Sequence, residues 1–264
     1  MENNHLSILL RSNGFSFCIL NRYTKEIDRV EHLEFGESNI TPQNQLLSLQ
    51  GFFKENLFLT KQYKSVSVTH CNNLSTFVPN PFFKKDSLKE YLQYTVKVLP
   101  SDFITYDPIE SADMINVYIP FVHFNNFLFD QFGSFEFKHS SSILVDELLK
   151  KSTNSRDPQF FVNVEKEFFQ ITIIQNKKLI FYNAFNFSTK EDFIYYILFT
   201  AEQLKLNPEV FKLILLGKIE KDSEFYEIVY TYVRHVEFYN ATIQNIETDD
   251  KSNHSNFILL NQHL

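Results

Sequence analysis

Two stretches of the sequence decide its fold: LSILLRSNGFSFCIL, residues 6–20, and FFVNVEKEFFQITII, residues 160–174. In each of them apolar residues recur at alternate positions on both sides of a short polar turn, which predicts a β-hairpin. At a shift of 154 positions, without a gap, Ile8 aligns with Val162 and the turn RSNG aligns with EKEF. The two hairpins therefore open two copies of one structural unit.

A strand, a helix and a further strand are predicted to follow the first hairpin. The strand runs from Ile27 to Phe35, and the helix begins with Thr41 as its N-cap and Pro42 in its first turn. We expect this helix to end near Leu59. The alternating sequence KSVSV, residues 64–68, predicts the last strand, so this part of the chain follows the order β-β-β-α-β.

The second hairpin is followed by the same order. LIFYNAFNF, residues 179–187, predicts a strand, and Ser188 to Glu191 show the capping-box pattern that opens a helix ending near Leu206. KLILLG, residues 212–217, predicts a buried strand, and another helix is expected to begin near Asp222. The repeated order favours an α/β protein of two similar halves over two unrelated segments that share a local order.

A polar stretch, KKSTNSRDP at residues 150–158, has the composition of a connection between domains. We therefore assign residues 1–152 to the first half and residues 153–264 to the second half. The first half carries an insertion at about residues 71–120, outside the repeated order.

Further elements are predicted outside the repeated order. Within the insertion we expect a helix from Ser87 and strands at residues 103–106 and 115–119. Near the end of the sequence, the polar residues 247–256 predict a mobile loop, and the apolar residues 257–260, FILL, predict a last strand.

Composition narrows the class of protein. The 264 residues are 44% hydrophobic and carry a net charge of −7, which is typical of a globular domain and argues against nucleic-acid binding, since no cluster of Lys and Arg occurs. No apolar run reaches about 18 residues, so no membrane span or signal peptide is expected. Cys18 and Cys71 are the only cysteines, and we expect both to be reduced in the cytoplasm.

Phenylalanine and glycine are present in unusual proportion, with 30 Phe and 5 Gly. So few glycines disfavour the Gly-rich loops that bring backbone amides against phosphate. Seven of the phenylalanines fall within residues 121–137. A helix from about Val122 would place residues 124, 128, 131 and 132 on one buried face, which we favour over an exposed partner-binding patch.

The duplicated order and the two hairpins resemble the actin-like ATPase fold, in which two ribonuclease H-like halves flank a nucleotide. More closely, LSILLRSNGFSFCIL and FFVNVEKEFFQITII resemble an uncharacterised bacterial family, DUF3822, which is similar in length and in a degenerate actin-like fold. The resemblance implies two ribonuclease H-like β-β-β-α-β-α halves, arranged as in the actin-like ATPase superfamily.

The resemblance also implies where phosphate loops would lie. Active members carry a D-x-G loop in each half, whose aspartate positions magnesium and whose glycine admits the phosphates. Here the first loop has Leu9 and Arg11 at these positions, and the second has Asn163 and Glu165. A leucine binds no metal, and a glutamate repels phosphate. The paired glycine on the adenosine side is reduced to Gly217, followed by Lys218.

Other chemistries receive little support. A ribonuclease H-type nuclease needs carboxylates on the opening strand, where Ile8 to Leu10 offer none. His70 and Cys71 are adjacent on a predicted strand, so their side chains point to opposite faces and cannot easily pair. The eight histidines show no metal-binding spacing, and neither a serine-hydrolase elbow nor a Walker loop is present.

The sequence therefore nominates no catalytic, cofactor-binding or metal-ligating residue. We expect a non-catalytic scaffold or protein-binding module that has a protein partner, with no prediction of oligomeric state. The alternative is a divergent nucleotide-binding protein or ATPase that uses Lys or Asn side chains in place of glycine amides, and it leaves ATP and magnesium open as cofactors.

Overall fold

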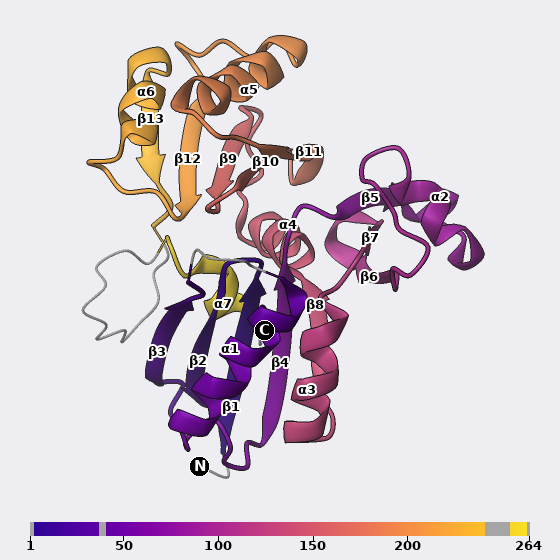
Figure 1. Ribbon diagram of the computed structural model, residues 1–264. Helices are drawn as coiled ribbons and strands as arrows, with labels where there is room; N and C mark the ends of the chain where they lie inside the picture. The colour runs from indigo at the N-terminus through magenta and orange to yellow at the C-terminus, as the bar shows by residue number, and fades with distance from the viewer. Residues whose placement is uncertain (1–2, 37–40, 241–253, 263–264) are drawn as a thin grey trace.

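The computed structural model describes residues 3–36, 41–240 and 254–262, and two five-stranded sheets form its two halves (Figure 1). In the first sheet the central strand β1 pairs antiparallel with β2, which confirms the predicted hairpin, and it pairs parallel with β4. The strands of this sheet are, in spatial order, β3 (Ile27–Glu34), β2 (Gly14–Asn21), β1 (Asn4–Arg11), β4 (Ser65–Cys71) and β8 (Glu136–His139).

The second sheet repeats this topology. Its central strand β9 pairs antiparallel with β10 and parallel with β12. Its strands are, in spatial order, β11 (Lys178–Asn186), β10 (Phe168–Gln175), β9 (Gln159–Val164), β12 (Lys212–Gly217) and β13 (His235–Phe238). The identical strand order confirms the duplicated α/β fold, while the division of the chain between residues 152 and 153 stays a prediction.

Helices cover the outer face of each sheet. Alternate residues of β1 and β2, such as Leu6 and Phe17, pack against α1 and α3, and alternate residues of β9 and β10 pack against α5 and α6. This is the arrangement expected of strands whose two faces are both buried. The outer helices are α1 (Pro42–Glu55), α3 (Val122–Phe132), α5 (Lys190–Gln203) and α6 (Glu224–Tyr232).

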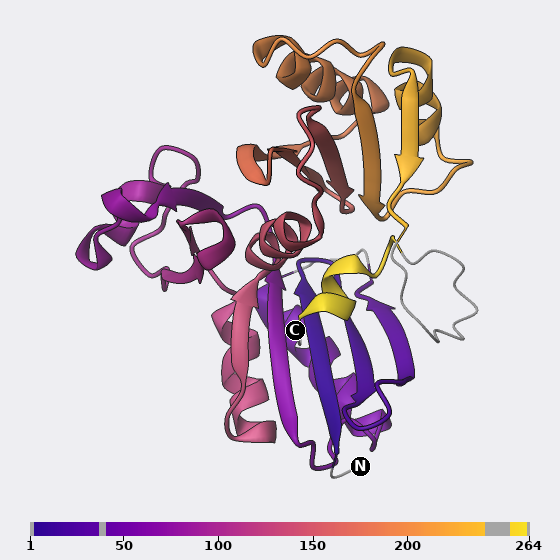
Figure 2. The same ribbon diagram turned by 180° about the vertical axis from the view of Figure 1, so that it is seen from behind.

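Two further helices, α4 (Ser140–Lys151) and α7 (Phe257–Asn261), lie between the halves (Figures 1 and 2). Helix α7 packs on the first sheet, where it contacts β1 and β2, whereas α4 contacts β10 and β11 of the second sheet as well as β4 and β8 of the first. Their apolar side chains join Leu9, Cys18 and Phe168 in one buried cluster. The two halves are thus held together by a shared apolar core.

The insertion forms a separate three-stranded sheet that projects to one side (Figure 1). The strands predicted at residues 103–106 and 115–119 correspond to β6 and β7. Their bounds are displaced by one to three residues, and the two strands pair antiparallel with each other. The elements of the insertion are β5 (Ser75–Pro79), η1 (Asn80–Phe82), η2 (Lys85–Ser87), α2 (Leu88–Leu92), β6 (Thr105–Ile109), η3 (Glu110–Ala112) and β7 (Met114–Tyr118).

Three helix ends differ from the prediction. The N-cap Thr41 is confirmed, but α1 ends at Glu55 rather than near Leu59, because Asn56 leaves the helical conformation (φ −117°, ψ 79°) and its side-chain amide bonds to the Phe52 carbonyl. Helix α5 ends at Gln203 rather than near Leu206. The capping box of α5 lies one residue later than predicted. Thr189 and Asp192 form it, and the Asp192 carboxylate also accepts from the backbone amide of Ser188.

The prediction of a last strand at residues 257–260 is wrong, because these residues form helix α7. All four apolar side chains are buried between α4 and the first sheet. A short run that is apolar at every position does not distinguish a buried strand from a buried helix. Of the loop predicted at residues 247–256, residues 247–253 lie outside the described part of the chain.

The phenylalanine-rich segment is mainly core, as favoured. Phe124 and Leu128 of α3 are fully buried, and most of the other phenylalanines between residues 121 and 137 pack partly against the same cluster. Gln131 is exposed, so the predicted face is narrower than expected. Phe129 is the exception among the phenylalanines, with 60% of its surface exposed.

Gly217, the last residue of β12, has a backbone conformation and a close contact that require glycine. It has a φ of +80°, and a Cβ atom there would lie 2.1 Å from the carbonyl oxygen of Val164. We expect Gly217→Ala to lower the free energy of unfolding by more than about 2 kcal/mol, through strain and this clash. Urea unfolding measures the loss. Gly51→Ala is the control, since nothing crowds that position in α1, and it should stabilise by about 0.5–1 kcal/mol. Equal stability of the two variants would contradict the conclusion that position 217 requires glycine.

Candidate functional site

The turn of each opening hairpin meets the other between the halves. Arg11 ends β1, and Glu165 holds the equivalent place after β9, 154 residues later. The Arg11 Nε atom donates to Glu165 Oε2 at 2.8 Å. Only 7% of Arg11 and 4% of Glu165 are exposed. The two copies of the repeat are therefore joined by a buried ion pair at matching positions.

The surroundings of Arg11 keep it charged. Burial alone would lower the pKa of its guanidinium, but the attraction of Glu165, helped by Cys71 and Glu34, outweighs burial and raises the pKa. A further guanidinium nitrogen, Nη1, donates to Ser16 Oγ at 2.8 Å. Arg11 is thus held by both a carboxylate and a hydroxyl, and its donors are directed at the protein itself.

More exposed ion pairs surround the buried one. Glu34 on β3 lies 3.6 Å from Lys166 and 3.5 Å from Lys218, both from the second half. The attraction of Lys218 lowers the pKa of the Glu34 carboxyl; burial opposes this effect, and the weaker attraction of Lys166 adds to it. Ser12 Oγ donates to Glu167 Oε2 at 3.3 Å. Several polar contacts beside the Arg11–Glu165 pair therefore also join the two halves.

The positions that the resemblance assigns to metal-binding aspartates have other roles. Leu9 is buried in the apolar cluster that α4 and α7 share. The Asn163 side-chain amide donates to Gln170 Oε1 at 2.9 Å, and Gln170 in turn donates to the Tyr182 hydroxyl at 2.9 Å. Neither position presents a carboxylate to the space between the hairpins.

The turn after β12 is closed onto the protein backbone. The Lys218 amide donates to the Val164 carbonyl at 2.7 Å, and the Gly217 amide donates to the His254 carbonyl at 3.1 Å. Gly217 thus allows β12 to approach β9 closely, as a structural turn would. The backbone amides of Gly217 and Lys218 thus both donate to carbonyl groups of the protein itself.

Among the described residues, a small cavity lies beside these turns. A cavity of about 10 Å³ is bordered by Arg11, Asn13, Glu34 and Lys218, among others. A volume of this size holds about one water molecule, whereas pockets for drug-sized ligands measure about 300–1,000 Å³. Phe168, which follows the second turn, is buried in the apolar cluster of the two halves.

His70 and Cys71 lie on opposite faces of β4, as their adjacency predicts. The His70 ring contacts Phe121 and Phe137, and burial lowers its pKa to about 3. Cys71 belongs to the apolar cluster on the other face, where burial and then Glu165 raise the pKa of the thiol. The pair has neither the contact nor the thiolate that nucleophilic catalysis requires.

A buried polar cluster at the start of α4 was not predicted from the sequence. The Asp107 carboxylate accepts from the Tyr118 hydroxyl at 2.9 Å, the Ser142 hydroxyl at 2.6 Å and the His139 amide at 2.8 Å. Burial raises the pKa of Asp107 in spite of these bonds. The cluster joins the insertion, through Asp107 and Tyr118, to the first turn of α4.

The same cluster contains a serine–histidine pair. The Ser141 amide donates to His139 Nδ1 at 3.2 Å, and His139 Nε2 lies 3.1 Å from Asn72 Oδ1, so the imidazole is neutral and carries its proton on Nε2. Burial lowers the pKa of His139 to about 3. Ser141 and His139 are both fully buried.

Two sequence signals could have located these features. Arg11 and Glu165 have opposite charges at equivalent positions of the repeat, which is compatible with a pair between the two hairpin turns. The run HSSS at residues 139–142 forms the N-cap and first turn of α4, with polar residues typical of a helix N-terminus.

Within the described ranges, no three His, Cys, Asp or Glu side chains come together as a metal ion would require. None of the helices described is both long enough and apolar enough to cross a membrane.

Solved structures with low sequence identity share this fold. A protein from Bacteroides thetaiotaomicron VPI-5482, described as having an actin-like ATPase fold and unknown function, has a TM-score of 0.81 at 22% identity, over 90% of this chain and 91% of that one. The PilM–PilN type IV pilus biogenesis complex contains a chain with a TM-score of 0.61 at 9% identity, over 97% and 96% of the two chains.

The ethanolamine utilization protein EutJ from Carboxydothermus hydrogenoformans has a TM-score of 0.52 at 7% identity, over 99% of this chain and 89% of that one. No curated protein matches the sequence. The family described as "Protein of unknown function (DUF3822)" matches residues 1–236. With the two matching sheets and the crossed pair of helices already described, this match shows that the chain belongs to the DUF3822 family and has an actin-like ATPase fold.

Proposed function

We propose that this protein is a non-catalytic scaffold that binds another protein and has lost the nucleotide site of its fold. The buried ion pair between Arg11 and Glu165 carries the proposal. It occupies the place where the resemblance would put the phosphates, between the two hairpin turns. A phosphate bound there would be repelled by the Glu165 carboxylate. It would also have to displace that carboxylate and so separate Glu165 from Arg11.

The neighbouring backbone supports the same conclusion. Phosphate loops rely on amides that point at the ligand. Here the Glu165 amide donates to the Phe168 carbonyl at 2.9 Å and the Lys218 amide donates to the Val164 carbonyl. Together with the small cavity beside Arg11, these bonds leave the turns poorly suited to hold a nucleotide.

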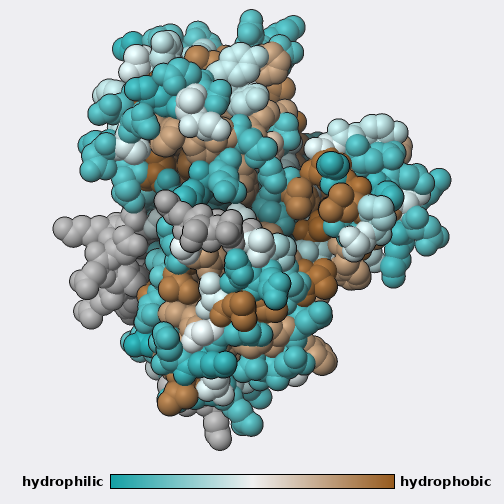
Figure 3. Space-filling view, viewed as in Figure 1, coloured by the Kyte–Doolittle hydropathy of each residue, from teal (hydrophilic) through white to brown (hydrophobic). Residues whose placement is uncertain are grey.

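Two observations support a protein partner. The similar chain in the PilM–PilN complex is part of an assembly, and the likeness extends over almost the whole of both chains. The insertion also exposes large apolar side chains, and Figure 3 shows apolar surface gathered where the insertion meets the rest of the molecule. Aromatic side chains supply much of the binding energy at protein interfaces. Exposed on the insertion are Phe82, Tyr94, Leu99 and Phe103.

A reducing compartment is part of the proposal, and we place the protein in the cytoplasm. Cys18 and Cys71 are both free and buried. Burial raises the pKa of the Cys18 thiol to about 12, with a smaller effect of Asp28, so this cysteine remains a thiol. Free, unreactive cysteines agree with a chain that was not selected for disulfide formation.

Nucleotide binding is the direct test of the proposal. We expect isothermal titration calorimetry with ATP and magnesium to give no binding heat at micromolar concentrations. Thermal unfolding should likewise be unchanged, whereas a ligand at 100 times its Kd would stabilise the protein by about 2.7 kcal/mol. Micromolar binding between the hairpin turns would overturn the proposal and favour the alternative, a divergent nucleotide-binding protein or ATPase.

The buried ion pair makes a second prediction, about stability. Arg11→Met leaves the Glu165 carboxylate buried without its partner, so we expect it to lower the free energy of unfolding by about 3–5 kcal/mol. Adding Glu165→Leu removes the stranded charge, and the double variant should recover most of the loss. Urea unfolding of the single and double variants measures both effects.

A surface pair of nearly equal length supplies the control. Lys212 Nζ lies 2.9 Å from Glu237 Oε1, but 53% and 54% of these side chains are exposed. We expect Lys212→Met to cost less than about 1 kcal/mol. If Arg11→Met cost no more than Lys212→Met, Glu165 would not depend on Arg11 for its buried charge, and the assignment of a buried ion pair at this position would be wrong.

A further inference from the structure

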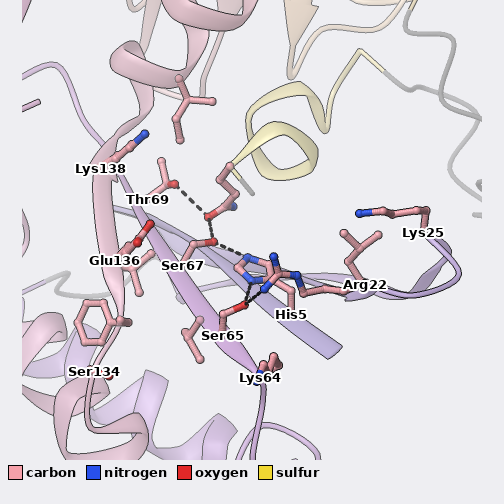
Figure 4. Close-up of a pocket in the computed structure, with 16 residues that line it drawn as sticks. His5, Arg22, Lys25, Lys64, Ser65, Ser67, Thr69, Ser134, Glu136 and Lys138 are labelled. Atoms are coloured by element: carbon pink, nitrogen blue, oxygen red, sulfur yellow. Dashed lines mark hydrogen bonds between the residues drawn. The ribbon is translucent and has the colours of Figure 1, made fainter. Parts of the chain in front are cut away.

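A cavity of about 500 Å³ lies on the inner face of the first sheet, at the end farther from Arg11 (Figure 4). Its floor consists of β1 and β4, and its rim consists of β8, the turn after β2 and Gln262, which follows α7. The lining extends along β4 from Ser65 to Thr69, which pairs with Leu9, but it includes none of the residues that border the small cavity beside Arg11. The cavity is therefore separate from the contact between the hairpin turns.

The cavity arises from a difference between the two halves. Helix α4, which covers the inner face of the second sheet, has 12 residues, whereas α7, which covers the inner face of the first, has 5. The shorter helix reaches only part of its sheet. Figure 2 shows α7 lying over one end of β1 and β2 and leaving the other end uncovered.

The uncovered floor is also chemically different from its counterpart. Ser7 pairs with Ser67 on the first sheet, and the equivalent pair on the second sheet is Phe161 with Ile214. The second pair packs into the apolar cluster round α4. On the first sheet Ser7 is fully buried, and the hydroxyl groups that line the cavity come from β4, namely Ser65, Ser67 and Thr69. This part of the face suits a polar ligand better than an apolar helix.

A chain of hydrogen bonds crosses the floor of the cavity from Arg22 to Gln262. Arg22 Nη1 donates to Ser65 Oγ at 3.4 Å, and His5 lies between Ser65 and Ser67, with Nδ1 at 2.7 Å from one hydroxyl and Nε2 at 2.9 Å from the other. Ser67 in turn donates to Gln262 Oε1 at 3.3 Å. Within the described residues, the buried Nε2 atom of Gln262 has no hydrogen-bond partner.

The rim is positively charged in a protein whose net charge is −7. It contains four cations and a single carboxylate, that of Glu136. In the part of the chain that the structure describes, none of the four lies within 4.0 Å of a carboxylate oxygen. These cations are Arg22, Lys25, Lys64 and Lys138 (Figure 4).

We propose that this cavity binds a small phosphorylated molecule. The four cations lie on different sides of the rim, so the molecule's phosphoryl group would bind to those nearest to it, since a dianion with three acceptor oxygens matches several positive donors. The rest of the molecule would lie against the apolar part of the wall, which includes Leu20, Phe135 and Ile143. The volume is within the range of small-molecule sites. The proposal is independent of the proposed scaffold function.

Phosphate probes test this site directly. We expect inorganic phosphate, pyrophosphate and glycerol 3-phosphate, at millimolar concentrations, to raise the midpoint of thermal unfolding. In the double variant Lys64→Ala/Lys138→Ala, binding of the best probe should weaken at least tenfold by calorimetry. Both lysines are exposed, so the variant is expected to fold. Tighter binding of glycerol 3-phosphate than of phosphate would identify an organic ester as the ligand, and equal binding would identify inorganic phosphate.

A matched variant controls for the loss of two charges. Lys54→Ala/Lys221→Ala removes two exposed lysines outside the cavity and should leave the response to each probe unchanged. Absence of any response in the wild-type protein, or an equal loss in both double variants, would overturn the proposal. The Lys64/Lys138 variant also separates the two proposals: an ATP signal that it removes comes from this cavity, and one that it leaves comes from the hairpin turns.

Discussion

Burial of the inner faces of both sheets is the constraint on which the structure depends. The outer faces are covered by helices of their own half, but the inner faces carry apolar residues such as Leu9 and Phe161 that need a cover as well. Helices α4 and α7 provide it by crossing to the opposite sheet. Removal of this apolar surface from water is the main force that holds the halves together.

The ion pair between Arg11 and Glu165 lies at one edge of that apolar contact. Its net contribution to stability is modest, because desolvation of both charges offsets much of their attraction. A misaligned arrangement of the halves would nevertheless leave both charges buried and unpaired. The apolar cluster supplies the affinity between the halves, while the ion pair disfavours other arrangements of the same surfaces.

Local patterns were sufficient to predict most of the fold. The alternation around Ile8 and Val162 identified both hairpins, and the shift of 154 residues identified the duplication. Patterns failed where the environment decides the outcome. Residues 257–260 are apolar at every position, so only their contacts with α4 and the first sheet make them a helix. Helix α4 itself was missed, because its buried face includes serines.

The contacts between distant residues were beyond the reach of sequence patterns. Arg11 and Glu165 were identified singly, yet nothing local shows that they meet. His5 lies on β1, Lys64 directly precedes β4 and Lys138 lies on β8, and that they line one cavity depends on the strand order of the sheet and on the length of α7. Such features follow from topology rather than from any segment.

The crossing of α7 also sets the order in which the fold can close. β1 and α7 are about 250 residues apart in sequence, yet α7 is the helix that covers β1. During synthesis the first sheet and its outer helices can form early, while Leu9 and Cys18 stay uncovered until α7 has been made. Completion of the first half therefore depends on synthesis of the second, and closure is a long-range step that both halves share.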